Sequence, residues 1–331
     1  MAKLVVRTNA YPHRVEETVG WEQEAFARAG VEFRFVRTTD LAELRAAVAE
    51  ADAVVTGGGA FDAETFAAMR RCRVVVSCSV GLDRVDLAAA SARGIMVCNM
   101  PDLCTDEVAD HAMALLLACN RKVVRLANRV RGGIWDRALL EPMPRLRGST
   151  AGLLGFGRIG QAMAERCRGF GMKVVAYDPY LPAEVARERG VELLELAELL
   201  ASADVVSCHL PHLESTHHLI GEAQFRAMKP SAYFVNTSRG KVVDEAVLIR
   251  ALRAGWIAGA GLDVLEQEPA APDNPLPAME QVIVTPHAAG FSDEVVDRIP
   301  RLAFEEVMAV LNGRTPRDIA WANRAAFQVR A

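Results

Sequence analysis

The chain has 331 residues, of which 51% are hydrophobic and 24% are charged, and this composition is typical of a soluble globular protein. The length is sufficient for two domains, and the formal net charge of −4 argues against a nucleic acid or an anionic membrane as a partner. The seven cysteines include no CxxC pair, so we expect reduced core thiols and a cytoplasmic protein. No apolar run reaches the roughly 20 residues of a membrane span, and we expect no signal peptide.

Short apolar runs alternate with helical patterns over the first hundred residues. This alternation predicts βαβ units and a parallel sheet. The strand candidates are residues 3–8, 31–36, 51–57, 72–78 and 94–99. Residues 102–130 then form a longer helical pattern with apolar residues on most faces of its first half. We interpret it as one buried connecting helix at a domain boundary.

The alternation resumes after a loop over residues 131–149 that is rich in Gly, Pro and Arg. Further strand candidates are residues 150–157, 172–178, 203–210, 231–237, 257–264 and 281–286. A final helix begins near Ser292, and we expect it to return to the first domain. The predicted fold class is therefore α/β, with two domains that are each built on a parallel sheet.

A glycine motif follows the strand candidate 150–157. Gly155, Gly157 and Gly160 form a G-x-G-x-x-G pattern that opens a helix, and Asp178 ends the next strand. Such glycines permit a tight turn, a close approach to a pyrophosphate and close packing of helix on strand, while the acid accepts from the adenosine ribose. Glycine turns also occur for packing alone, but the strand, the helix and the acid are all in place. Residues 178–180 include no arginine for a 2′-phosphate, so the motif predicts NAD rather than NADP.

The strand candidate 231–237 ends in a polar step that contains Arg239, directly followed by Gly240. Ligands of open parallel sheets bind beyond the carboxyl ends of the strands, so an arginine here is in a position to bind an anion. Taken alone, an arginine at a strand end is more often a solvated surface residue.

Seven stretches extend this pattern along the chain. They are SVGLDRVDL (79–87), NMPDLCTDEVADHAMALLL (99–117), RLRGSTAGLLGFGRIG (145–160), HLPHLESTHHLIG (209–221), VNTSRGKVVDEAVL (235–248), GLDVLEQEP (261–269) and TPHAAG (285–290). In this order they resemble the D-isomer-specific 2-hydroxyacid dehydrogenases over nearly the whole chain. Within that family the sequence is most similar to bacterial relatives of the C-terminal-binding proteins and to the branch similar to phosphoglycerate dehydrogenases.

The resemblance implies an NAD-dependent enzyme that interconverts a 2-oxo acid and a D-2-hydroxy acid. It also implies that Arg239, Glu268 and His287 are the catalytic residues. A histidine can supply and accept the proton near neutral pH, a neighbouring carboxylate can orient it and favour its charged form, and an arginine matches the substrate carboxylate. Glu266 is the alternative acid, but Glu268, just before Pro269, matches the family position.

Further site residues are implied by the same resemblance. The cofactor-binding set is Thr105, Gly155, Gly157, Arg158, Ile159, Gly160, Asp178, Leu210, Pro211, Thr237, Ser238 and Asp263, with Asp263 at the nicotinamide end. The substrate carboxylate is expected to meet backbone N–H groups of Ser79, Val80 and Gly81 as well as Arg239 and His287. We expect His111 to be a satisfied buried residue, and no metal site at the histidines of 209–218.

The resemblance further implies how the domains are arranged and paired. Residues 1–100 and 291–331 would form a flavodoxin-like substrate domain, and residues 101–290 an NAD-binding Rossmann domain, with the active site in the cleft between them. The family also implies a homodimer that forms largely through the cofactor domain and the helix after residue 101. Two alternatives remain on this scaffold: an NAD(H)-sensing, corepressor-like interaction protein, and a phosphite dehydrogenase. The second is disfavoured, because Ser77 and Cys78 supply no lysine near the substrate loop.

Overall fold

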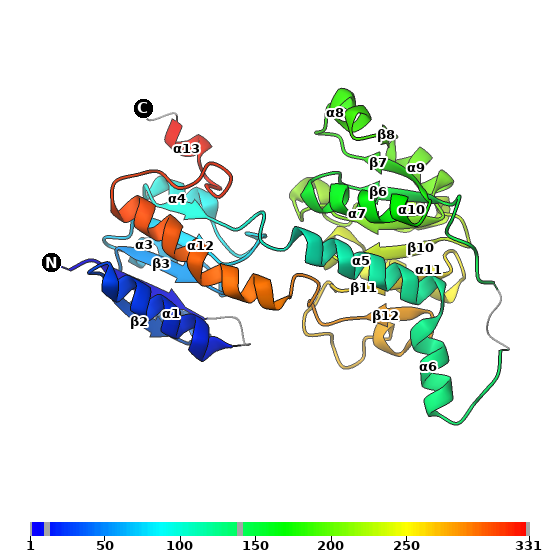
Figure 1. Ribbon diagram of the computed structural model, residues 1–331, viewed down its shortest axis with the longest axis horizontal. Helices are drawn as coiled ribbons and strands as arrows, with labels where there is room; N and C mark the ends of the chain where they lie inside the picture. Colours follow the sequence, from blue (N-terminus) through cyan, green and yellow to red (C-terminus); the bar gives the residue numbers. More distant parts are fainter. Residues whose placement is uncertain (1, 10–13, 138–141, 329–331) are drawn as a thin grey trace. The chain divides into compact units, whose positions relative to one another are not determined.

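The computed structural model describes residues 2–9, 14–137 and 142–328. It divides into two compact units: the first consists of Met1–Cys104 and Ser292–Ala331, and the second of Thr105–Phe291. Each unit is built on one parallel sheet that helices cover (Figure 1), so the predicted α/β class is confirmed. Residues 138–141, within the predicted loop 131–149, lie outside the described residues.

The first sheet has five parallel strands in the order β2-β1-β3-β4-β5, which is the flavodoxin-like order. Its strands are β1 (Leu4–Thr8), β2 (Glu32–Val36), β3 (Ala53–Thr56), β4 (Val74–Ser77) and β5 (Met96–Cys98). The helices of this unit are α1 (Val15–Arg28), α2 (Leu41–Val48), α3 (Ala63–Ala68), α4 (Leu87–Ala92), α12 (Asp293–Leu311) and α13 (Ala325–Gln328). Every residue of β1, β3 and β4 is buried, as expected for inner strands of a parallel sheet.

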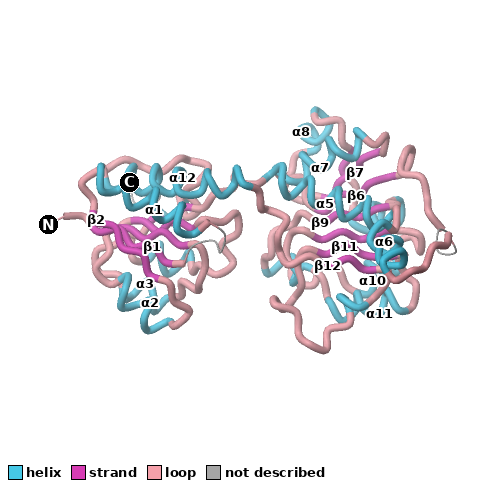
Figure 2. Tube along the Cα trace, turned by 60° about the horizontal axis from the view of Figure 1, so that its bottom comes forward, coloured by secondary structure: helices cyan, strands magenta, loops and turns pink. Residues whose placement is uncertain are grey.

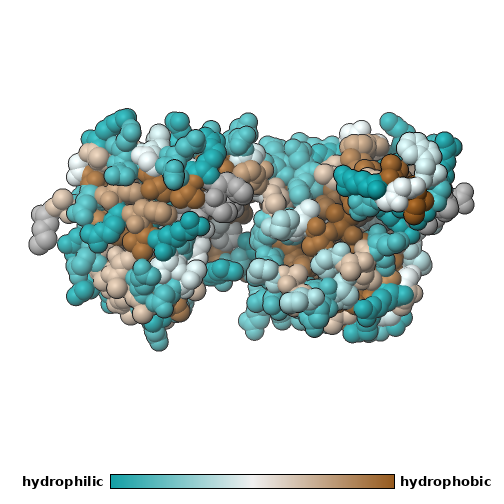
Figure 3. Space-filling view, turned by 90° about the horizontal axis from the view of Figure 1, so that it is seen from below, coloured by the Kyte–Doolittle hydropathy of each residue, from teal (hydrophilic) through white to brown (hydrophobic). Residues whose placement is uncertain are grey.

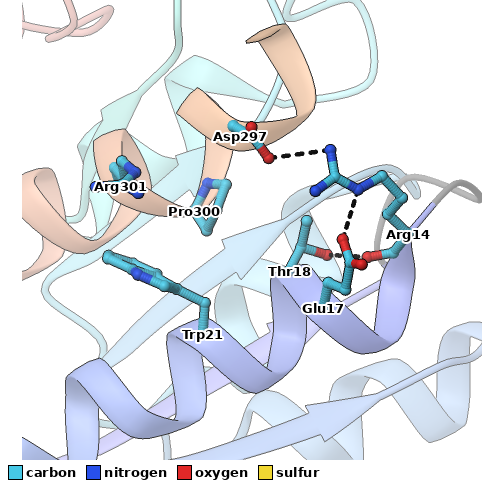
Figure 4. Close-up of a pocket in the computed structure, with 7 residues that line it drawn as sticks. All are labelled: Arg14, Glu17, Thr18, Trp21, Asp297, Pro300 and Arg301. Atoms are coloured by element: carbon cyan, nitrogen blue, oxygen red, sulfur yellow. Dashed lines mark hydrogen bonds and ion pairs between the residues drawn. The ribbon is translucent and has the colours of Figure 1, made fainter. Parts of the chain in front are cut away.

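Helices α1 and α12 pack against each other, although they come from opposite ends of the chain (Figure 1). The rings of Trp21 and Phe304 meet edge to face with centroids 6.0 Å apart, and the Arg301 guanidinium lies 5.4 Å from the Trp21 ring centroid. Arg14 forms an ion pair with Asp297 at 3.1 Å, beside a small pocket of about 170 Å³ (Figure 4). The last long helix therefore belongs to the same unit as the first.

The second sheet has seven parallel strands in the order β12-β11-β10-β9-β6-β7-β8 (Figure 2). With β6 as the first strand, this is the 3-2-1-4-5-6 order of dinucleotide-binding domains with one strand added. The strands are β6 (Thr150–Leu154), β7 (Lys173–Tyr177), β8 (Glu192–Leu193), β9 (Val205–Cys208), β10 (Tyr233–Asn236), β11 (Gly259–Leu262) and β12 (Val282–Val284). The edge strand β8 was not predicted, because two residues are too few to show a periodic pattern.

The helices of the second unit include a break that the sequence pattern did not predict. They are α5 (Thr105–Asn120), α6 (Val123–Arg131), α7 (Arg158–Gly169), α8 (Ala183–Glu188), α9 (Leu196–Ser202), α10 (Glu222–Ala227) and α11 (Glu245–Arg253), with short 3-10 turns η1 (Glu214–Thr216), η2 (Gly240–Val242) and η3 (Leu276–Ala278). The prediction of one helix over 102–130 was wrong, because the chain turns at Lys122, where φ is 54°. Half of α5 is buried whereas no residue of α6 is, so the break falls where the buried stretch ends. None of the helices in the described part of the chain has both the length and the apolar character that a bilayer crossing requires.

The seven cysteines are buried and form no disulfide, which agrees with the prediction of core thiols. Burial raises the pKa of six of these thiols, for example to about 12 at Cys72 and to about 11 at Cys78; the others are Cys98, Cys119, Cys167 and Cys208. These six thiols are therefore protonated at neutral pH and poorly reactive.

A buried ion pair lies in the first unit, between β1 and α1. Arg7 and Glu22 are 1% and 0% exposed, and the Arg7 Nη1 lies 3.0 Å from the Glu22 Oε1. The same Nη1 donates to the Cys78 Sγ, just after β4, at 3.0 Å. Burial raises the pKa of Glu22 to about 7, although the Arg7 charge acts in the opposite direction. Desolvation offsets much of the attraction in such a pair, so it contributes little net stability but is costly to break from one side.

Replacing Arg7 alone should destabilise the chain strongly. Arg7→Leu leaves the Glu22 carboxylate buried without its cation, which costs about 3–5 kcal/mol. The raised pKa of Glu22 means that stability is retained while the group is protonated and is lost as pH rises through that pKa. The loss should therefore be larger at about pH 8 than at about pH 5, and urea unfolding at both pH values measures it.

The double variant Arg7→Leu/Glu22→Leu removes both charges and should recover most of the lost stability. Arg28→Leu is the matched control, because Arg28 pairs with Glu24 on the exposed face of α1, where such pairs contribute about 0.2–1 kcal/mol. An Arg7→Leu variant as stable as Arg28→Leu would contradict this account.

Candidate active site

A glycine-rich turn joins β6 to α7 at the carboxyl edge of the second sheet. Gly155 has a φ of 88°, which favours glycine, and a Cβ there would lie 3.0 Å from the His209 carbonyl oxygen. A Cβ at Gly160 would lie 2.3 Å from the Gly155 carbonyl oxygen, so α7 packs directly on the turn. In contrast, a Cβ at Gly157, the N-cap of α7, would meet no atom within 4 Å. The turn leaves open space at the helix N-terminus, where a pyrophosphate would bind.

The Asp178 carboxylate lies beside this turn. Its Oδ2 accepts the Phe156 N–H at 3.0 Å, and its Oδ1 accepts the Tyr180 N–H at 3.1 Å. An acid in this position can accept from the ribose hydroxyls of a dinucleotide whose phosphates lie on the turn. Of the two predicted residues that open α7, Arg158 is exposed and Ile159 is half-buried.

Other predicted cofactor-binding residues lie at the ends of neighbouring strands. Leu210 and Pro211 follow β9, and Thr237 and Ser238 follow β10, whereas Thr105 is the first residue of α5. Because β6, β9 and β10 are neighbours in the sheet, the four residues that follow β9 and β10 lie at the same sheet edge as the glycine turn. The Thr237 hydroxyl is buried and has no hydrogen-bond partner within the described residues. The open turn, the acid beside it and this unpaired hydroxyl fit a bound NAD molecule.

His287 and Glu268 form a hydrogen-bonded pair. The His287 Nδ1 lies 2.7 Å from the Glu268 Oε2, and the side chains are 49% and 36% exposed. This bond raises the pKa of His287, against the opposing effect of burial. Burial is the largest single effect on Glu268 and by itself raises its pKa, but the bond and charge of His287, the Leu265 N–H and the Arg239 charge together lower it. Each partner therefore favours the charged form of the other.

The neighbouring acid, Glu266, has other partners. It forms an ion pair with His218, and its carboxylate accepts the Glu245 N–H at 3.3 Å. Of the two acids considered from the sequence, Glu268 is thus the one hydrogen-bonded to His287.

Arg239 follows β10 at the same sheet edge, and Gly240 has a packing reason to come next. A Cβ at Gly240 would lie 2.0 Å from the carbonyl carbon and oxygen of Leu265, so glycine alone lets the end of β10 approach the segment before Glu268. The Arg239 Nη1 donates to the carbonyl of the preceding residue at 2.7 Å. The effects of burial and of the bond between His287 and Glu268 on the pKa values of this pair are larger than that of Arg239. The positive charge of Arg239 acts to lower the pKa of both residues.

Asp263 lies next to the segment that carries His287. It is 1% exposed, and its Oδ1 accepts the Thr285 hydroxyl at 2.6 Å. Backbone N–H groups of Ala288 and Ala289 donate to its Oδ1 and Oδ2, both at 2.9 Å. The sequence interpretation assigned Asp263 to the cofactor only and missed this supporting role, because the Thr285 contact depends on the pairing of β11 with β12.

His111 is hydrogen-bonded, as expected, but it is not fully buried, so that part of the expectation was wrong. It is 26% exposed, and its Nε2 lies 2.9 Å from the Thr285 Oγ1 and 3.5 Å from the Asp263 Oδ1. The apolar pattern around His111 comes from the neighbours on α5 that face the sheet, whereas His111 itself points to the sheet edge.

Residues 79–81, the predicted carboxylate loop, follow β4 in the first unit. The Ser79 hydroxyl donates to the Gly81 carbonyl at 2.7 Å and lies 2.8 Å from the Ser77 hydroxyl. The Val80 carbonyl accepts the Asn99 side-chain amide at 2.6 Å. The loop is thus held at the carboxyl edge of its own sheet.

The histidines of residues 209–218 have local partners. His209 lies 2.9 Å from the Ser207 hydroxyl, and burial lowers its pKa to about 4. His212 bonds to His217 at 3.3 Å, and His217 stacks on His218 with ring centroids 4.1 Å apart. Over residues 2–9, 14–137 and 142–328, no three His, Cys, Asp or Glu side chains are grouped so that they could hold a metal ion.

Residues 113–289 match the family model described as "D-isomer specific 2-hydroxyacid dehydrogenase, NAD binding domain". A glyoxylate reductase of Korarchaeum cryptofilum is 45% identical over 81% of each chain. A D-3-phosphoglycerate dehydrogenase of Archaeoglobus fulgidus is 40% identical over 78% of this chain, which spans 49% of that longer relative. The crystal structure of a D-lactate dehydrogenase from Aquifex aeolicus, complexed with NAD and lactic acid, matches with a TM-score of 0.83 and 32% identity, over 93% of this chain and 96% of that one.

Proposed function

Because the chain belongs to the D-isomer-specific 2-hydroxyacid dehydrogenase family, we propose that it interconverts a 2-oxo acid and a D-2-hydroxy acid with His287 as general acid and base. It is an NAD-dependent oxidoreductase, and the bound cofactor would supply a hydride to the substrate carbon as NADH or accept one from it as NAD⁺. The observation that carries the proposal is the 2.7 Å hydrogen bond between His287 Nδ1 and Glu268.

This bond decides which nitrogen of His287 would exchange the proton. With Nδ1 held by Glu268, Nε2 on the other side of the half-exposed ring is left to meet the substrate oxygen. In reduction the imidazolium donates its Nε2 proton to the carbonyl oxygen, and in oxidation neutral Nε2 accepts the hydroxyl proton. Glu268 stabilises the imidazolium and so retains the acid form near neutral pH.

Arg239 would anchor the substrate carboxylate. Its planar guanidinium matches a carboxylate in two parallel hydrogen bonds, and it lies at the sheet edge that also carries the glycine turn. Backbone N–H groups of residues 79–81 would complete the anion site. The first unit would thus be the substrate domain and the second the NAD-binding domain.

The relatives named glyoxylate reductase support a small 2-oxo acid such as glyoxylate as the substrate. The free, buried cysteines support a reducing compartment such as the cytoplasm.

Glu268→Gln should shift both limbs of the pH–rate profile toward acid. The substitution removes the charge that raises the pKa of His287. Reduction needs the imidazolium, so the fall of the reductive rate with rising pH should begin at a lower pH than in the wild type. Oxidation, which needs neutral His287, should extend to lower pH. Initial rates in both directions across pH measure the shift, and a primary deuterium isotope effect verifies that hydride transfer limits the rate.

His287→Ala and Glu266→Gln frame this experiment. Loss of the general acid should lower kcat by about 100- to 10,000-fold with NADH affinity unchanged. Glu266→Gln is the matched control and should leave the profile in place, because Glu266 binds His218 instead. Superimposed profiles for wild type and Glu268→Gln would remove Glu268 from its role.

Arg239→Lys should lower kcat/KM by about 10- to 100-fold with NADH affinity little changed, because lysine keeps the charge but loses one of two charge-assisted bonds. The rate of NADH oxidation is measured with each acid of a substrate panel, which consists of glyoxylate, pyruvate, hydroxypyruvate and longer 2-oxo acids. A wild-type chain that binds NADH tightly but turns over no acid of the panel would indicate a sensor, and NAD reduction by phosphite would indicate the other alternative. Near-normal turnover of Arg239→Lys would mean that the anion is held elsewhere.

We also propose a homodimer that forms through α6. No residue of this helix is buried, so its apolar side chains face solvent: Val123, Val124 and Val130 are 54%, 42% and 49% exposed. Beside α6 a groove of about 1000 Å³ extends to β12 and is lined by apolar side chains such as Ile283 together with charged ones such as Arg125. Figure 3 shows apolar surface on this unit. A second copy presents the same exposed valines, so a symmetric pairing would cover both sets.

Val124→Asp should weaken this association, because it places a charge in the apolar contact. Sedimentation equilibrium should show a dimeric wild type and a Val124→Asp variant that shifts toward the monomer. Val185→Asp on α8 is the matched control, since Val185 is also exposed, at 37%, but lies on another helix. A monomeric wild type at about 10 μM would contradict the proposal.

A further inference from the structure

Helix α5 brings His111 to the segment that carries His287. The His111 Nε2 lies 2.9 Å from the hydroxyl of Thr285, which is 174 residues away in sequence. The approach is close because β11 has a glycine where α5 crosses it: a Cβ at Gly261 would lie 2.8 Å from the Leu115 Cβ. His111 is therefore held on a helix that packs tightly on the sheet.

The hydrogen bonds around Thr285 have a defined direction. Its hydroxyl carries one hydrogen, and the carboxylate of Asp263, 2.6 Å away, can only accept. Two backbone N–H groups also donate to that carboxylate, so both of its oxygens act as acceptors. Thr285 thus donates to Asp263 and must accept from His111, so the His111 Nε2 carries a proton. This nitrogen donates whether the ring is neutral or charged.

Asp263 in turn fixes the backbone of His287. Its carbonyl accepts the His287 N–H at 2.8 Å, and its carboxylate accepts the next two N–H groups of the segment. His287 has a φ of 52°, a left-handed conformation that is unfavourable for a residue with a side chain. Such a conformation persists only where the surroundings impose it, and Asp263 supplies the bonds that do so.

We propose that His111 is a positioning residue for His287, acting through Thr285 and Asp263. The directed chain from His111 to Asp263 holds the carboxylate in the orientation in which both of its oxygens bind the His287 segment. The His287 ring is then kept within hydrogen-bonding distance of Glu268. This inference rests on the proposed role of His287 as the general acid and base.

Two substitutions break the chain at different points. His111→Leu removes the first donor, and Thr285→Val removes the hydroxyl at nearly constant shape. Each should lower kcat by about 10- to 100-fold, the effect of a small displacement of a reacting group, with the Kd for NADH unchanged. The double variant should be no slower than the slower single variant, because both act through the same carboxylate.

Two further measurements separate positioning from a general loss of structure. His111→Gln places an amide N–H near the position of Nε2 and should restore most of kcat. The reductive pH limb of His111→Leu should move toward acid, because a displaced His287 is less well paired with Glu268. A purely structural role for His111 would lower the unfolding midpoint and leave that limb in place, and this result would overturn the proposal.

Asp110→Asn is the matched control on the same helix, because Asp110 is exposed and pairs with Arg166 on the surface. It should behave as wild type. If His287→Ala keeps wild-type turnover, the proposed function itself fails. If His287→Ala is inactive while His111→Leu and Thr285→Val keep wild-type kcat and pH limbs, only the positioning role fails. Should His111→Leu not fold, Thr285→Val decides the question, because it breaks the same chain.

Discussion

The buried carboxylate of Asp263 is the constraint on which the geometry of the candidate site depends. A charge that is 1% exposed must be compensated by donors, and here the donors come from the segment that follows β12. By accepting from that segment, Asp263 determines where His287 lies and which way its backbone turns. The position of His287 relative to Glu268 is thus a consequence of satisfying a buried charge.

The order of the strands brings the remaining groups to the same edge. β6, β9, β10 and β11 are consecutive neighbours in a parallel sheet, so their carboxyl ends carry the glycine turn, Thr237, Arg239 and Asp263 side by side. The pairing of the strands is therefore sufficient to bring together residues that are far apart in the sequence. The cofactor end and the proposed chemical end of the site are products of one sheet edge.

Much of this arrangement follows from local sequence patterns. Apolar runs bounded by turn residues identified the longer strands, and the glycine motif with Asp178 identified the nucleotide turn, because both signals are short-range. The break at Lys122 was missed, since no glycine or proline marks it and only burial distinguishes α5 from α6. The contact between His111 and Thr285 was also missed, because it depends on how closely a helix crosses a strand. The preference for Glu268 over Glu266 as the partner of His287 rested on the family resemblance alone, because only the fold separates the surroundings of the two acids.

Glycine is required in the site for two independent reasons, which apply at different positions. At Gly160 and Gly240 a single added carbon would overlap neighbouring backbone atoms, so a chain that is required only to fold must keep both. At Gly157 the protein itself has room for a side chain, and only a bound phosphate would clash with it. A lineage that lost its need for the dinucleotide but kept the fold would therefore be free to change Gly157 first, and the residue at this position would record whether a related chain still binds a nucleotide.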